Sequence, residues 1–177
     1  MTTYIALLRG INVGGNVKLP MADLRKLVAS VGGEDVQTYI QSGNVVFTHT
    51  ARSAPKLTAE LEAAIRHGTG FDIAVVLRTA NELGDVIEHN PYDATDPTKV
   101  HVVFLSEAPL ATALDKIDAA RFAPEEMTSR GRELYLHLPD GMGRAKLPTQ
   151  LGKLGPAVSA TARNWRTVLK LHDLATA

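Results

Sequence analysis

The order of the apolar patterns in the first eighty residues constrains the fold of this chain more than any other sequence feature. Pro20 begins a helical pattern of apolar residues, and Gly32 and Gly33 end it. In full, the patterns are a strand at 4–9, a helix at 20–31, strands at 36–41 and 44–48, a helix at 55–67 and a strand at 73–78. This order, strand–helix–strand–strand–helix–strand, predicts a ferredoxin-like half.

The second half repeats this order less regularly. A helix at 80–88 leads into a loop at 90–98 that contains two prolines. The patterns beyond the loop are a strand at 99–105, a weak helix at 109–120, strands at 126–130 and 133–138, a short helix at 147–153 and a helix at 164–175. We therefore predict an α+β protein with two small ferredoxin-like halves and a C-terminal helix. The predicted divisions are a first domain at 1–80, a helix and linker at 81–98, and a second domain at 99–177.

Two strands of the first half are apolar throughout, without alternation between polar and apolar residues. They lie at 4–8 and 73–77, and such runs are typical of strands that are covered on both faces. The helices of a ferredoxin-like half cover one face, so the second half, the C-terminal helix or another subunit must cover the other. This pattern disfavours an open RNA-binding sheet that displays stacking aromatic residues.

The composition excludes several classes of protein. There are no cysteines, which excludes disulfides, thiolate catalysis and cysteine-ligated zinc. No apolar run approaches the length of a membrane span, and the N-terminus lacks the basic and apolar regions of a signal peptide. We therefore expect a cytoplasmic protein with no membrane partner. The six histidines form no HExxH or HxH pattern, so no metal site is predicted.

The net charge is zero, but the charged residues are unevenly distributed. Residues 1–30 carry four Lys or Arg and one Asp, residues 31–140 carry nine Lys or Arg and seventeen Asp or Glu, and residues 141–177 carry six Lys or Arg and one Asp. The two ends are basic and the middle is acidic. Ends that meet in the fold would form one positive region, whereas chance clustering on solvated faces would form none.

A glycine-rich stretch at 10–15 lies between the first strand and the first helix. Glycines permit left-handed backbone and bring N–H groups close to a ligand, and the start of a helix carries partial positive charge. The stretch lacks the Lys and Ser/Thr of a P-loop and the spacing of a dinucleotide-binding loop. It is therefore either a structural turn or an anion site of another kind. The candidate ligand-binding residues here are Arg9, Asn12, Gly14, Gly15 and Lys18.

The start of the last helix is a second candidate anion site. Thr161 or Asn164 can cap this helix through a side-chain oxygen. Arg163 and Arg166 place positive charge where the helix dipole disfavours it. A carboxylate from the acidic middle or a bound anion would remove that penalty, so Arg163 and Asn164 join the candidate ligand-binding residues.

The strands at 36–41 and 44–48 meet in a hairpin whose tip is Ser42-Gly43. We expect this tip at the end of the sheet where the first strand begins, opposite the glycine-rich stretch. On that expectation the tip is a plain tight turn that takes no part in the anion site.

Three blocks, LLRGINVGG at 7–15, QSGNVVF at 41–47 and RNW at 163–165, closely resemble the bacterial family called domain of unknown function 1697. The resemblance extends from residue 4 to residue 171, and the stretch 147–157 departs from it by its additional Gly and Pro. It implies two ferredoxin-like α+β domains and no established activity. The marked positions of the family fall on Arg9, Gly10, Asn12, Gly14, Gly15, Lys18, Ser42, Gly43, Asn44, Arg163, Asn164 and Trp165.

The sequence leaves three functions open and identifies neither a cofactor nor a catalytic residue set. The first is binding of a small anionic or phosphorylated ligand in a basic cleft between the two halves. The second is a non-enzymatic interaction module that forms a homodimer through the second face of a sheet. The third is nucleic-acid binding, which the neutral net charge and the few aromatic residues disfavour. Whether the protein is an enzyme stays undecided.

Overall fold

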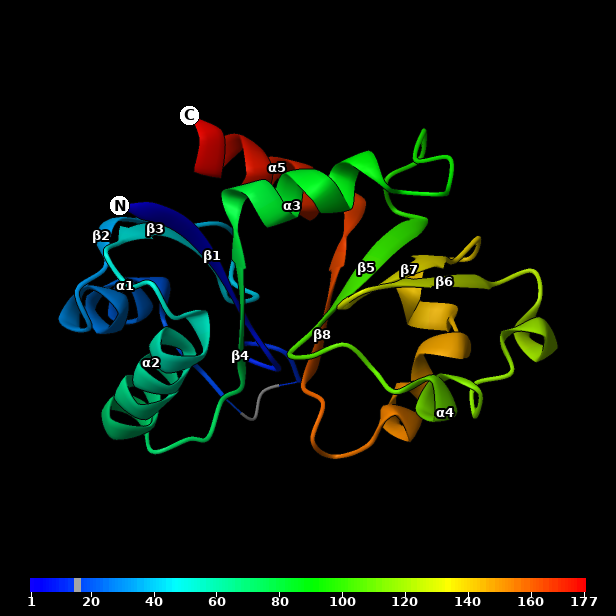
Figure 1. Ribbon diagram of the computed structural model, residues 1–177, viewed down its shortest axis with the longest axis horizontal. Helices are drawn as coiled ribbons and strands as arrows, with labels where there is room; N and C mark the ends of the chain where they lie inside the picture. Colours follow the sequence, from blue (N-terminus) through cyan, green and yellow to red (C-terminus); the bar gives the residue numbers. More distant parts are fainter. Residues whose placement is uncertain (15–16) are drawn as a thin grey trace. The chain divides into compact units, whose positions relative to one another are not determined.

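The structure, a computed structural model, describes residues 1–14 and 17–177, which form two compact units. The first unit contains Met1–Gly84 and Leu171–Ala177, and the second contains Asp85–Lys170 (Figure 1). The division into domains at 1–80, 81–98 and 99–177 stays a prediction. Among the described residues, no helix is both long and apolar enough to cross a membrane.

The first unit has the predicted strand and helix order. Its four-stranded sheet has the order β2-β3-β1-β4, with antiparallel pairs throughout, which confirms the ferredoxin-like arrangement. The elements are β1 (Thr2–Leu8), α1 (Met21–Ser30), β2 (Glu34–Thr38), β3 (Asn44–His49), α2 (Ala54–Thr69) and β4 (Val75–Thr79).

Local signals in the sequence fix the ends of both helices. Pro20 is the residue just before α1, not its first helical residue, and no side chain caps that helix. Ser53 caps α2 by accepting a hydrogen bond from the amide of Lys56 at 3.3 Å. Gly70 ends α2 in the left-handed conformation, with φ of 79°.

The helices cover one face of the sheet, and the other face is buried as well. Alternate β1 residues Tyr4, Ala6 and Leu8 join the core beneath α1 and α2. The intervening Ile5 and Leu7 point to the opposite face and are also fully buried. The expectation that β1 is covered on both faces is therefore confirmed, and the same holds for Val75 to Leu77 of β4. The same core also contains Leu24 and Val28 of α1, Leu57, Leu61 and Ile65 of α2, Val45 and Phe47 of β3, and Ile11, Leu19 and Ile73 of the connecting loops.

The second unit repeats the strand order of the first. Its sheet has the order β6-β7-β5-β8, again with antiparallel pairs. The elements that follow β4 in the chain are α3 (Ala80–Glu88), β5 (Val100–Leu105), α4 (Ala111–Leu114), β6 (Glu126–Arg130), β7 (Glu133–His137), β8 (Ala160–Asn164) and α5 (Trp165–Thr176). Shorter 3-10 segments lie at Ala119–Phe122, Met142–Arg144 and Leu147–Leu154.

Two sequence expectations for this unit were wrong. The helix expected at 109–120 is only the short α4 and a 3-10 turn, because Ala113 and Ile117 are the buried residues there and give no continuous apolar stripe. The second error is β8, which was not predicted because TARN has no run of apolar residues; its pairing with β5 decides its conformation. The short helix expected at 147–153 is present as a 3-10 helix at Leu147–Leu154, in a stretch interrupted by Pro and Gly.

Buried side chains connect β7 to α3 and anchor α5. The Tyr135 hydroxyl of β7 donates to the carbonyl of Val86 in α3 at 2.8 Å, and burial raises the pKa of Tyr135 to about 12. Trp165, Val168 and Leu171 of α5 are buried, whereas Leu169 is exposed.

Gly43 offers a test of how tightly β1 and the hairpin pack. Its φ is 86°, and an added Cβ would lie 2.7 Å from Leu8 Cβ. Gly70 has a similar φ of 79° but open space around it. We expect Gly43→Ala to lower the free energy of unfolding by about 3 kcal/mol and Gly70→Ala by about 1 kcal/mol, since only the first adds a clash to the backbone strain. Urea unfolding of the two variants measures the difference, and equal losses would contradict the packing.

The burial of His101 predicts that the protein loses stability as the pH falls. This histidine lies within the buried strand β5, and its Nδ1 is buried with no hydrogen-bond partner among the described residues. Burial lowers the pKa of the His101 imidazole. The unfolded state therefore binds more protons as the pH falls below about 6.5, and stability is lost there.

We expect His101→Leu to remove this part of the pH dependence. Between pH 6.5 and 5, the free energy of unfolding of wild type should fall relative to that of the variant by up to about 1.4 kcal/mol per pH unit. Urea unfolding at several pH values measures this, with the exposed His67→Gln as the control. Parallel pH profiles for wild type and His101→Leu would contradict it.

Candidate functional site

Asn12 holds the long loop between β1 and α1 in shape. Its φ is 54°, in the left-handed region, and its amide donates to the carbonyl of Val17 at 2.7 Å. Its side-chain Oδ1 accepts from the amide of Leu19 at 2.9 Å, and Nδ2 donates to the carbonyl of Leu19 at 2.9 Å. A second Nδ2 hydrogen bond, of 2.8 Å, reaches the carbonyl of Gln41. Both side-chain donor hydrogens are therefore used within the protein.

The hairpin tip lies beside this loop, so the expectation that it lies at the opposite end of the sheet was wrong. Because β3 is antiparallel to β1, the first residue of β3 lies next to the end of β1, and Leu7 pairs with Asn44. The amide of Leu8 donates to the carbonyl of Gly43 at 2.8 Å. The glycine-rich loop and the QSGN turn thus form one structural feature.

A cavity of about 430 Å³, here called the loop groove, lies where this loop meets α1. It is lined by Asn12, Lys18, Pro20, Met21 and Gln41. The amides of Met21 and Ala22, in the first turn of α1, have no hydrogen-bond partner among the described residues. With the exposed Lys18 they form a cationic, hydrogen-bond-donating environment that suits an anion.

A second cavity of about 510 Å³, here called the helix groove, adjoins the first. It lies between α1 and the end of α2, and it shares Lys18 and Pro20 with the loop groove. Its other lining residues include Asp23, Lys26, Leu27 and Phe71.

Two further candidates from the glycine-rich loop, Arg9 and Gly14, are exposed. Arg9 is exposed just beyond β1, and its amide donates to the carbonyl of Ala74 at 3.0 Å. Gly14 is exposed with φ of 68° and open space around it. Neither belongs to the described lining of the two grooves. Gly15 lies outside the described residues.

Arg163 is part of the second sheet, not of an exposed helix start. It lies in β8 opposite Val102, and only 7% of it is exposed. Its Nη1 donates to Thr161 Oγ1 at 2.7 Å and to the carbonyl of Ala162 at 2.8 Å. Burial lowers the pKa of its guanidinium to about 10. Its predicted contact with a ligand stays a prediction.

Arg78 occupies the matching place in the first sheet, which sequence reasoning missed. It lies in β4 opposite Ile5, is 1% exposed, and donates from Nη1 to the carbonyl of Leu77 at 2.8 Å. The sequence signal that could have indicated this match is an Arg followed directly by a residue that can cap a helix. Arg78 precedes Thr79, and Arg163 precedes Asn164.

The residues after the two buried arginines cap the following helices. Asn164 Oδ1 accepts from the amide of Thr167 at 2.9 Å, as one of the two predicted caps. Thr79 and Glu82 form a reciprocal capping box at α3. The Thr98 hydroxyl and amide lower the pKa of the Asp96 carboxyl, and the charges of Lys99 and Arg166 lower it further.

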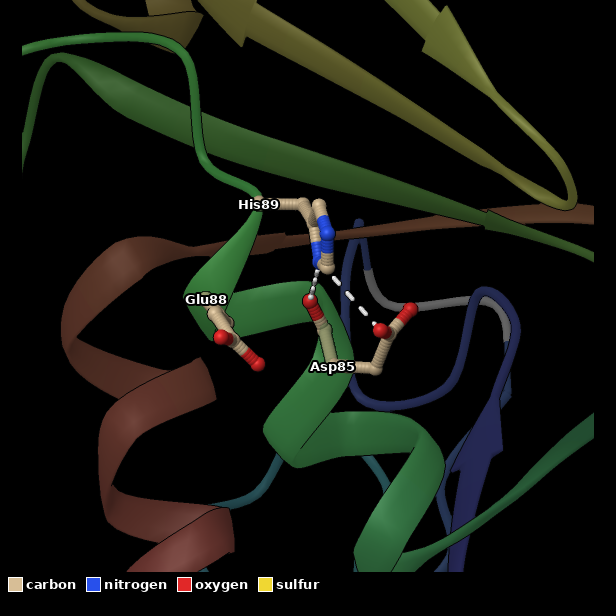
Figure 2. A group of neighbouring side chains, drawn as sticks. All are labelled: Asp85, Glu88 and His89. Carbon is tan, nitrogen blue, oxygen red and sulfur yellow. Dashed lines mark hydrogen bonds and ion pairs between the residues drawn. The ribbon is translucent and has the colours of Figure 1, made fainter.

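Asp85, Glu88 and His89 gather at the end of α3, on one side of the helix (Figure 2). Their ligand atoms lie within 4.8 Å of one another, and spacing of three and four residues in the expected helix 80–88 could have indicated the group. Arg130 Nη1 donates to Asp85 Oδ2 at 2.6 Å, and this hydrogen bond lowers the pKa of Asp85. His89 Nδ1 lies 3.2 Å from Asp85 Oδ1. We interpret the group as an exposed ion-pair network and assign no metal to it.

Comparison with known proteins agrees with the fold and supplies no activity. The structure is similar to the conserved bacterial protein SP0830 from Streptococcus pneumoniae, with a TM-score of 0.74 and 24% sequence identity over 100% of this chain and 99% of that chain. No curated protein matches the chain. The model of the DUF1697 family, proteins of unknown function, matches residues 1–135, which include the loop and hairpin blocks but not the RNW block. The chain therefore belongs to the DUF1697 family.

Proposed function

We propose that the loop groove binds a small anionic or phosphorylated ligand and that Lys18 supplies its main positive charge. The observation that carries this proposal is an exposed lysine, with no carboxylate partner among the described residues, beside the uncapped first turn of α1. The groove has a volume of about 430 Å³, within the usual range for small-molecule sites, and its described lining contains no Asp or Glu.

Asn12 has a supporting part in this proposal. Its side-chain donors are engaged by the carbonyls of Leu19 and Gln41, so it shapes the groove and does not donate to the ligand. The charge on the ligand would be met by the Lys18 ammonium and by the amide of Met21, which both belong to residues that line the groove. These two groups are a binding arrangement, since no nucleophile and base accompany them in the described groove lining.

The other sequence candidates stay predictions. Arg9 and Gly14 belong to the same loop and would contact a ligand that extends beyond the groove, whereas Gly15 lies outside the described residues. Arg163 and Asn164 belong to the second unit, where the first is buried in β8 and the second caps α5. The experiment tests the proposal for Lys18 and the start of α1.

We expect inorganic phosphate to stabilise the protein through Lys18. At a hundredfold its dissociation constant a ligand adds about 2.7 kcal/mol to the free energy of unfolding, which raises the melting temperature by several degrees. Lys18→Ala should weaken phosphate binding by about tenfold, because a charge-assisted hydrogen bond is lost. Thermal unfolding and calorimetric titration measure the two effects.

The matched control is Lys56→Ala, an exposed lysine of the same unit whose side chain lies 3.9 Å from Glu60. It should bind phosphate as wild type does. Equal weakening of phosphate binding in both variants would contradict a site at Lys18. So would a phosphate effect that disappears when ionic strength is held constant, because general ionic screening would then explain it. A response to oligonucleotides alone, or a concentration-dependent dimer without any ligand response, would favour the nucleic-acid or interaction-module alternatives instead.

A further inference from the structure

We infer that the anion bound at Lys18 carries a planar apolar ring, and that this ring occupies the helix groove against Phe71. The inference rests on the proposed function and specifies its ligand class: a phosphate monoester, or a similar single anionic group, joined directly to a ring. Neither groove alone points to this class. The evidence is that the two cavities share one lysine and one proline, and that the helix groove alone has an aromatic residue in its described lining.

The two grooves adjoin at Lys18 and Pro20. Both residues line the loop groove of about 430 Å³ and the helix groove of about 510 Å³. A ligand whose charged group meets Lys18 therefore has the helix groove directly beside it. A bare phosphate would leave that second volume to water, whereas a ring attached to the phosphate would fill part of it and bury apolar surface.

Phe71 gives the helix groove an aromatic surface. Although Phe71 is a large apolar residue, 44% of it is exposed, and it lies outside the buried core of its unit. Its backbone is held in place because its amide donates to Thr69 Oγ1 at 3.1 Å, while that hydroxyl donates to the carbonyl of Ile65 at 2.7 Å. The ring is thus presented on a fixed turn after α2, where a second ring can stack on it.

Close packing of α1 against α2 gives the helix groove further apolar lining. Gly68 of α2 approaches Leu27 of α1 so closely that an added Cβ would lie 2.6 Å from Leu27 Cδ2. Leu27 is only partly buried and lines the helix groove with Pro20. The groove therefore has apolar contacts from both helices and from the turn that carries Phe71.

The charges of the two grooves orient such a ligand. The described lining of the loop groove contains Lys18 and no carboxylate, so it favours the anionic group. The helix groove is lined by Lys18 and Lys26 as well as by Asp23, so its carboxylate offsets part of its positive charge. We therefore place the anionic group in the loop groove and the uncharged ring in the helix groove.

Three probes with the same head group test this inference: inorganic phosphate, methyl phosphate and phenyl phosphate. Calorimetric titration at constant ionic strength should show that phenyl phosphate binds wild type about fivefold or more tightly than methyl phosphate, as expected for an aromatic stacking contact. Phe71→Ala should remove this advantage and leave methyl phosphate unchanged. Phe71→Tyr, which keeps the ring, should retain it.

The outcomes separate this inference from the proposed function. Equal binding of methyl and phenyl phosphate, with Lys18→Ala weakening both, would overturn the ring and leave the anion site standing. A phenyl advantage that persists in Phe71→Ala would overturn the placement against Phe71. No binding of any of the three probes would overturn the proposed function and the inference together. Circular dichroism and thermal unfolding of each variant show whether its fold is retained.

Discussion

Burial of the central strand on both faces is the constraint on which the rest of each unit depends. In the first unit, Ile5 to Leu8 are at most 1% exposed, and β1 lies between β3 and β4. In the second, β5 has the same place between β7 and β8. A strand enclosed in this way must be apolar and must lie inside the sheet. The same constraint makes His101 in β5 destabilising, because its Nδ1 is buried and finds no hydrogen-bond partner among the residues that the structure describes.

The loop after β1 depends on that strand and on one amide side chain. The exposed chain begins at Arg9, where the buried strand ends, and Asn12 then ties the loop both to its own far end and to the hairpin tip. Because Gly43 packs on Leu8 in the same place, the loop, the hairpin and β1 support one another. The loop groove beside Lys18 is therefore held in shape by contacts among three segments, and the proposed binding of an anion there requires no rearrangement of these contacts.

Sequence patterns predicted most of the first unit because its strands and helices have strong periodicity. They failed where tertiary pairing overrides local preference: residues 160–164 carry no apolar run, yet they pair with β5. The hairpin tip was predicted at the wrong end of the sheet, although the antiparallel direction of β3 places it next to the end of β1. For the site, the sequence indicated Lys18 and Asn12 but not their different roles, because hydrogen bonds to the carbonyls of Leu19 and Gln41 depend on folding. Phe71 was missed since an aromatic residue after a helix resembles an ordinary core residue until its exposure is known.

The identical strand order of the two sheets provides a natural comparison within one molecule. Both units use a central buried strand, a matching edge strand with a buried arginine, and a capped helix directly after it. They differ in the connection after the central strand, which extends from Arg9 to Pro20 in the first unit and only from Ser106 to Leu110 in the second. The second unit forms the same strand order with the short connection, so this strand order does not by itself require the length of the first one.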